Sequence, residues 1–309
     1  MAAIETAGLT KRYGPVTAVH DLTFAVREGA VTGFLGPNGA GKTTTLRMIL
    51  ALARPTAGSA TVKGRPYAQL DQPARTVGAN LEVAGAHPGR KGRDHLRALA
   101  AMASLPMSRV DEVLRIVELD GAGDRRAGKY SLGMRQRLGL AATLLDDPEV
   151  LVLDEPANGL DPQGIRWLRD FLRGLAAEGR TVLVSSHVLA EVAQTVDDVV
   201  VIHRGRLVDH GPVSRLTAGG HVIARSPRAA ELRAALERAG LGVTADGDTL
   251  VVEADEAARV GDVAFEAGVP LHELTTRATS LEEAFLELTR DEERGEGEAA
   301  AGDERSEFQ

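Results

Sequence analysis

The stretch GPNGAGKTT, residues 36–44, most constrains what this chain can fold into. It follows a short apolar run, VTGFL (31–35), and opens an apolar helical pattern that extends from Lys42 to about Leu52. A G-x-x-x-x-G-K-[S/T] pattern between a buried strand and a helix is typical of a loop that holds phosphate groups. An incidental glycine-rich turn is the alternative, but it leaves the flanking strand and helix unexplained.

Each residue type in this loop has a chemical reason. Glycines permit backbone dihedrals and close approaches that a Cβ would block. The loop amides are expected to point into one concavity at the positive end of the helix dipole. Lys42 would reach the β- and γ-phosphates, Thr43 would place its hydroxyl on Mg²⁺, and Thr44 would support the α-phosphate. The candidate nucleotide-binding residues here are Gly36, Pro37, Asn38, Gly39, Ala40, Gly41, Lys42, Thr43 and Thr44.

Two later apolar strands also end in residues suited to this chemistry. The run VLVLDEP (150–156) ends with Asp154 and Glu155, and TVLVSSH (181–187) ends with His187. Ligands of open parallel sheets bind beyond the carboxyl ends of the strands. Asp154 would hold Mg²⁺, Glu155 would act as the base for an attacking water, and His187 would donate to the γ-phosphate or to that water. A charged turn and a structural histidine are the alternatives. The candidate catalytic residues are therefore Glu155, His187 and Lys42.

The order of the predicted elements indicates two domains. Short strands occupy residues 1–35, a mostly helical block follows at about 90–146, and strands alternate with helices again from residue 150. This alternation favours a parallel α/β sheet covered on both faces and interrupted by the helical block. Beyond residue 217 the pattern becomes β-α-β-β-α-β, the ferredoxin-like order. The expected domains are 1–217, with a helical subdomain at about 83–146; 218–290, a small α+β domain; and 291–309, an acidic disordered tail.

Composition excludes some classes of function. No apolar run approaches the roughly 18 residues that a membrane-spanning helix needs, and the N-terminal residues do not resemble an export signal. The formal net charge of −8 argues against binding a nucleic acid.

The stretch YSLGMRQR (130–137) has no obvious nucleophile or metal-ligand spacing, yet it precedes an apolar helical run at 139–145. Together with the motifs above, it resembles the ATP-binding subunit of ABC transporters over about residues 4–215. That family's signature, Leu-Ser-Gly-Gly-Gln, is matched by residues 130–134. The resemblance implies that Ser131 and Gly133 form an anion site at a helix N-terminus that caps a γ-phosphate bound by a second copy, arranged head to tail.

The resemblance implies roles for three more residues. Tyr13 would stack on adenine, although a lone surface tyrosine is the alternative. Asp161 belongs to a loop that crosses the dimer interface. Glu82 stands where the family usually has a glutamine that touches Mg²⁺ and the attacking water. A glutamate keeps an oxygen ligand for Mg²⁺ but lacks the amide donor. Leu132 and Met134 also depart from the signature.

These variants and the C-terminal domain resemble the ATPases of bacitracin-type and other drug exporters. The expected fold is therefore a P-loop NTPase (ABC ATPase) α/β core with an antiparallel β-subdomain, an inserted helical subdomain and a small C-terminal α+β domain. The expected function is ATP hydrolysis, with ATP and Mg²⁺, that powers a separate transmembrane permease at the cytoplasmic face of the membrane. The exported molecule would be a drug, an antibiotic or a lipid-like compound.

Three alternatives stay open at this point. One is a soluble ABC ATPase acting on ribosomes or DNA, and another is the ATPase subunit of an importer. A third is a regulatory module that binds nucleotide without hydrolysing it, although the complete set of candidate catalytic residues argues against it. The cargo is not indicated, because the membrane subunit mainly selects it in this family.

Overall fold

The structure, a computed structural model, describes residues 2–81, 85–189, 194–216, 220–254, 256–278, 281–283 and 285. The chain divides into two compact units, Met1–Pro212 and Val213–Gln309. Two of the predicted features, Glu82 and the acidic tail at 291–309, lie outside the described residues. No helix among the described residues is both long and apolar enough to cross a bilayer.

The first unit begins with a three-stranded antiparallel sheet in the order β2-β1-β4. Its strands are β1 (Ala2–Tyr13), β2 (Val16–Arg27) and β4 (Ala57–Val62). Strand β2 alternates buried Leu22, Phe24 and Val26 with exposed neighbours, the pattern of a strand with one face on a core. This sheet is the expected antiparallel β-subdomain.

A six-stranded sheet in the order β5-β6-β7-β3-β8-β9 forms the centre of the unit. It is parallel from β5 to β8, and β9 is antiparallel. The strands are β3 (Val31–Leu35), β5 (Val77–Asn80), β6 (Val150–Leu153), β7 (Thr181–Ser186), β8 (Asp198–His203) and β9 (Arg206–Pro212). Strands β3, β6 and β7 are buried along their whole length, as in a parallel sheet covered on both faces. Because β6, β7 and β3 are neighbours, the three candidate motifs leave the sheet side by side.

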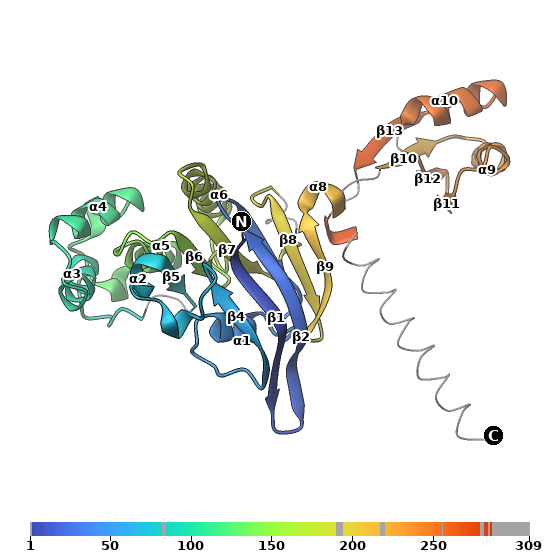
Figure 1. The fold of residues 1–309 in the computed structure, drawn as a ribbon. Coiled ribbons are helices and arrows are strands. Elements are labelled where there is room, and N and C mark those ends of the chain that lie inside the picture. The colour runs from blue at the N-terminus through green and yellow to red at the C-terminus, as the bar shows by residue number, and fades with distance from the viewer. Residues whose placement is uncertain are drawn as a thin grey trace, which may run out of the picture. The chain divides into compact units, whose positions relative to one another are not determined.

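Helices flank this sheet, and three of them make up the helical block. These three are α3 (Gly92–Met102), α4 (Ser108–Ile116) and α5 (Leu132–Thr143), and Figure 1 shows them gathered beside β5 and β6, away from β8 and β9. The other helices among the described residues of this unit are α1 (Lys42–Ile49), α2 (Pro73–Thr76) and α6 (Pro162–Ala177), with short 3₁₀ turns at Tyr67–Gln69, Asp120–Ala122 and Ala127–Lys129.

Helix α1 differs from its predicted bounds, whereas α5 begins at the predicted place. Helix α1 ends at Ile49 rather than near Leu52, because Ala51 adopts a positive φ of 57° that stops the helix. Helix α5 starts at Leu132, where the Ser131 side chain caps it, so Ser131 and Gly133 lie at a helix N-terminus as expected.

The second unit contains a four-stranded sheet in the order β11-β12-β10-β13, with every neighbouring pair antiparallel. Its elements are α8 (Val213–Leu216), β10 (Gly220–Arg225), α9 (Ala229–Arg238), β11 (Val243–Asp246), β12 (Thr249–Glu253), α10 (Ala257–Glu266) and β13 (Glu273–Ala278). Leu232 and Leu236 of α9 and Val260 of α10 are buried in one core with apolar residues of β10 and β12. This is the expected small α+β domain.

Candidate active site

A cavity of about 460 Å³ lies at the carboxyl ends of β3, β6 and β7. The loop after β3 supplies one wall, and residues that follow β6 and β7 supply the other. The lining residues are Ala18, Asn38, Gly39, Gly41, Lys42, Thr43, Thr44, Glu155, Asn158 and His187. Three motifs that are far apart in the sequence therefore meet in one cavity.

The lysine that ends the glycine-rich loop donates hydrogen bonds back to the backbone of that loop. The Lys42 ammonium donates to the carbonyl oxygens of Gly36 at 2.7 Å and Pro37 at 3.2 Å, and the side chain is only 6% exposed. Gly41 has a φ of 102°, and a Cβ at this position would lie 2.6 Å from the carbonyl oxygen of Ala18. Only glycine fits there, so the loop shape depends on it. The resulting cradle at the start of α1 suits an anionic phosphate chain.

Asp154 is held by hydrogen bonds to both of its carboxylate oxygens. Thr43 Oγ1 donates to Oδ2 at 2.6 Å, and Ser185 Oγ donates to Oδ1. The Asp154 amide donates to the Asn80 carbonyl oxygen at 2.8 Å, which fixes the backbone as well. A hydroxyl and a carboxylate side by side next to a phosphate cradle are the oxygen ligands that Mg²⁺ prefers.

Glu155 is aimed into the cavity by three contacts. Its Oε1 lies 3.2 Å from Lys42 Nζ, its Oε2 lies 2.7 Å from His187 Nδ1, and its amide donates to Ser185 Oγ at 2.9 Å. Its φ of 48° is left-handed, a conformation that costs a non-glycine residue about 1–3 kcal/mol and is concentrated at functional sites. A carboxylate held in this way, with a histidine beside it, can accept a proton from a water molecule.

A second pocket, of about 400 Å³, surrounds the signature stretch. Ser131 Oγ accepts from the Met134 amide at 3.2 Å and caps α5, whereas Asp161 Oδ1 accepts from the Gly164 amide at 2.7 Å and caps α6. The Ser131 hydroxyl accepts in its cap, so its own proton can still be donated to an anion. The pocket is lined by Ser131, Leu132, Gly133, Met134, Arg137, Gly159, Asp161, Gln163 and Gly164, and none of the lining residues of the first cavity belongs to it.

Comparisons with known proteins identify the family of the chain that carries these two pockets. Residues 19–158 match the family model described as ABC transporter. The chain is 43% identical over 216 residues to the bacitracin transport ATP-binding protein BcrA of Bacillus licheniformis, covering 69% of this chain and 71% of that protein. The chain belongs to the ABC transporter family. It is an ATP-binding subunit of that family and an ATPase.

Other relatives extend the similarity to the rest of this ABC ATPase. It is 36% identical over 310 residues to the daunorubicin resistance ATP-binding protein DrrA3 of Streptomyces coeruleorubidus, covering 94% of this chain and 97% of that protein. A solved structure described as the ATP binding subunit of an ABC transporter is 28% identical, with a TM-score of 0.62, over 69% of this chain and 91% of that one. Residues 220–282 match a domain of unknown function, DUF8746.

The structure of the ABC ATPase does not place every predicted residue in the cavity. Gly36 and Pro37 contribute carbonyl oxygens to Lys42 instead, and Ala40 is buried. Tyr13 is 52% exposed at the end of β1, with the Lys11 ammonium 4.9 Å from its ring centroid, and it does not line the cavity.

Sequence reasoning missed the roles of two residues. Ser185 was expected only as part of the segment before His187, but its hydroxyl connects Asp154 to the Glu155 amide. Its position at the carboxyl end of a strand is a signal that could have been used. Ala18, at the edge of the cavity, carries no chemical signal in the sequence.

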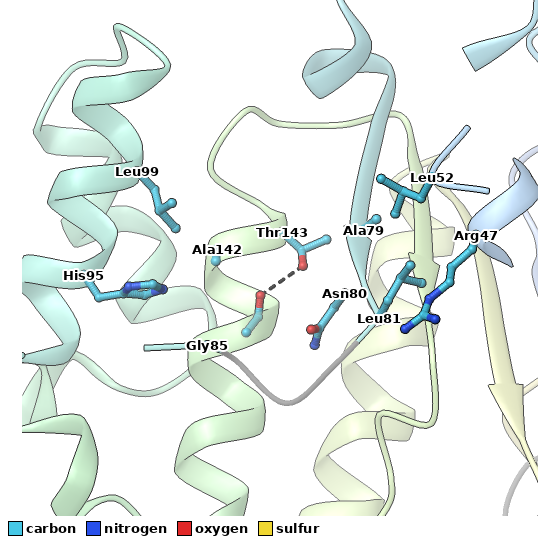
Figure 2. A pocket seen from close by; sticks show the side chains of 11 residues that line it. Arg47, Leu52, Ala79, Asn80, Leu81, Gly85, His95, Leu99, Ala142 and Thr143 are labelled. Atoms are coloured by element: carbon cyan, nitrogen blue, oxygen red, sulfur yellow. Dashed lines mark hydrogen bonds between the residues drawn. The ribbon is translucent and has the colours of Figure 1, made fainter. Parts of the chain in front are cut away.

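A third pocket of the ABC ATPase, of about 590 Å³, forms a groove between the helical block and the core. Figure 2 shows His95 and Leu99 of α3 on one side and Arg47 and Leu52 on the other. Thr143 Oγ1 donates to the Gly139 carbonyl oxygen of its own helix at 2.9 Å. The complete lining is Arg47, Leu52, Ala79, Asn80, Leu81, Gly85, His95, Leu99, Gly139, Ala142 and Thr143. None of these residues lines the nucleotide cavity.

Proposed function

We propose that this ABC ATPase powers a separate membrane permease from the cytoplasmic face of the membrane and exports a drug, an antibiotic or a lipid-like molecule. The names of its relatives support export, since they include bacitracin transport, daunorubicin resistance and lantibiotic transport proteins. The similarity to the daunorubicin resistance protein extends over 94% of this chain and so includes the C-terminal unit.

The observation that carries the proposal is the separation of the two pockets. Lys42 and Glu155 line one pocket, whereas Ser131 and Gly133 line the other, so the signature residues lie outside the chain's own phosphate cradle. A second copy placed head to tail would bring its Ser131 hydroxyl and Gly133 amide to the γ-phosphate held by the first. The positive end of the α5 dipole would then face that phosphate.

In such a pair the chemistry would be phosphoryl transfer to water, which depends on positioning and charge stabilisation. Lys42 and the loop amides would neutralise the phosphate chain, and Thr43 and Asp154 would hold Mg²⁺. The metal would supply further charge stabilisation on the phosphate oxygens. Glu155 would polarise the attacking water, and His187 would hold the Glu155 carboxylate in position through the 2.7 Å contact. Tyr13 would stack on adenine, and Asp161 would lie at the interface.

ATP would favour the closed pair, and loss of the γ-phosphate would let it reopen. The groove between the helical block and the core offers the permease a place to sense this change. Its walls combine apolar Leu52, Leu81 and Leu99 with basic Arg47. An amphipathic helix with an acidic residue on its polar side, supplied by the permease, would fit such a groove.

Sedimentation of the Glu155→Gln protein tests the paired site. With ATP this variant should sediment as a dimer, because binding persists while hydrolysis is slowed. Adding Lys42→Ala should abolish the dimer by removing phosphate contacts. Adding Ser131→Glu should also abolish it, because the new carboxylate would face the partner's γ-phosphate. A Glu155→Gln protein that stays monomeric at saturating ATP contradicts the shared site.

Co-purification with a membrane protein tests the transport role. Leu99→Glu should reduce recovery of the permease because it puts a charge into the groove. Met102→Glu is the matched control on the same helix, since Met102 is 84% exposed and does not line the groove. Recovery of ribosomes or DNA in place of a permease would favour a soluble ABC ATPase.

A further inference from the structure

A short loop joins the two pockets within one chain. Asn158 lines the nucleotide cavity with Glu155, whereas the next residue, Gly159, lines the signature pocket. The loop is tightly turned, because the Asn158 amide donates to the Glu155 carbonyl oxygen at 3.1 Å and the Leu160 amide donates to the Ala157 carbonyl oxygen at 3.1 Å. A displacement of Gly159 is therefore passed directly to Asn158 and Glu155.

The first residue of α5 packs on this loop. A Cβ added to Gly159 would overlap Cδ2 of Leu132, so the leucine side chain lies directly against the glycine. Gly159 has a φ of 73°, a conformation that favours glycine. A Cβ on Gly133 would also be in ordinary contact, 3.5 Å from Cδ2 of Leu160. The start of α5 and the loop after Glu155 are thus in van der Waals contact through Leu132 and Gly159.

We infer that Leu132 is a positioning residue that couples the two nucleotide sites of the pair, an inference that rests on the proposed function. Ser131 and Gly133 flank Leu132 and would touch the partner's γ-phosphate. Any shift of this turn on phosphate binding presses the Leu132 side chain against Gly159 and so moves the loop that carries Glu155. A glycine at position 132, as in the commonest form of the signature, would lack this contact. Occupation of one site therefore changes the catalytic geometry of the other.

The test measures the ATP dependence of hydrolysis. The wild-type protein should show a Hill coefficient between 1 and about 2, the limit for two sites. Leu132→Ala should bring it to about 1 and lower kcat about 2- to 30-fold, the range for substitutions along a coupling route. Leu132→Met, which keeps a side chain long enough to reach Gly159, should restore both values. Loss of packing alone would not remove cooperativity while leaving ATP-driven dimers intact.

Two further measurements separate the inference from the proposed function. Glu155→Gln combined with Leu132→Ala should still form the ATP dimer, which shows that the paired site survives. If Leu132→Ala does not fold, Leu132→Val, which stays apolar but lacks the Cδ2 atom that lies against Gly159, should likewise bring the Hill coefficient to about 1. A cooperative Leu132→Ala protein, or a wild-type protein with a Hill coefficient of 1 that nonetheless dimerises, overturns the coupling. Failure of Glu155→Gln itself to dimerise overturns the proposed function.

Discussion

His187 holds the Glu155 carboxylate from one side, with Nδ1 2.7 Å from Oε2. The other oxygen, Oε1, lies 3.2 Å from Lys42 Nζ, so both carboxylate oxygens have a defined partner in the cavity. The lysine is the first residue of α1, after the loop that follows β3, and the histidine follows β7. The orientation of the proposed base therefore depends on two neighbouring strands of the central sheet.

Replacing Glu155 by Gln should lower ATP turnover about 10²- to 10⁴-fold, the usual contribution of general-base catalysis. ATP affinity should persist, because the amide leaves the phosphate cradle intact. Steady-state phosphate release and equilibrium binding of a labelled ATP analogue measure the two effects. Glu149→Gln, an exposed change just before β6, is the control and should keep wild-type turnover. Near-normal hydrolysis by Glu155→Gln would remove this residue from the mechanism.

Ser185→Ala should reduce turnover about 10- to 100-fold, which corresponds to about 1.4–2.8 kcal/mol. The substitution removes the hydroxyl that donates to Asp154 and accepts from the Glu155 amide, so both residues lose a fixed partner. Ser186→Ala is the matched control, since Ser186 Oγ bonds only the backbone of Val188 among the described contacts. Equal kinetics for the two variants would show that Ser185 does not position the site.

Much of this arrangement follows from local sequence patterns. The glycine loop, Asp154, Glu155 and His187 could be predicted because each directly follows an apolar strand. In a parallel sheet these strand ends meet at one edge, and the order β6-β7-β3 makes them neighbours. The β-α-β-β-α-β order of the second unit was equally readable, since its elements are short and separated by turns.

Contacts between distant elements could not be predicted in this way. Ser185 reaches Asp154 across 31 residues, and nothing in either segment specifies the hydroxyl's direction. The packing of Leu132 on Gly159 depends on how α5 approaches the loop after β6. Tertiary packing rather than local propensity decides such features.

Arg109 ties helix α4 to the end of α5. Its guanidinium donates to the carbonyl oxygens of Leu145 at 3.1 Å and Leu144 at 2.8 Å and pairs with Asp147 at 3.1 Å, and the side chain is 15% exposed. Arg109→Ala should therefore destabilise the first unit by about 1–3 kcal/mol, because carbonyl groups lose their donor. Lysine should not restore this stability, since it lacks the planar fork of donors.

Urea denaturation followed by fluorescence measures this change in the first unit, because Trp167 of α6 is the only tryptophan in the sequence. The control is Arg97→Ala on α3, whose exposed pair with Asp94 spans 3.3 Å. Removing such a surface pair should cost about 0.5 kcal/mol or less. An Arg109→Ala protein as stable as this control would contradict the capping role.

His95 gives the groove a defined response to pH. Burial and the nearby charge of Arg90 lower the His95 pKa below its ordinary value of 6.5, and Nδ1 has no hydrogen-bond partner among the described residues. Above about pH 6.5 the histidine is neutral in both folded and unfolded chains and adds no pH dependence. Below it the unfolded chain takes up a proton while the folded chain does not, so stability should fall until the folded pKa is reached.

Replacing His95 by Gln should make this loss smaller, because the variant has no group to protonate at this position. The unfolding midpoints of the wild-type protein and of the variant are measured at pH 7.5 and at pH 5.5. Comparing the loss of stability between the two proteins cancels the acid response that other groups contribute equally to both. His272→Gln, an exposed change in the second unit, is the control and should keep the wild-type difference between the two pH values. If His95→Gln and the wild type lose equal stability on acidification, the histidine is not held neutral in the groove. In that case, a permease helix bound in the groove against His95 would contact a protonated histidine rather than a neutral ring at mildly acidic pH.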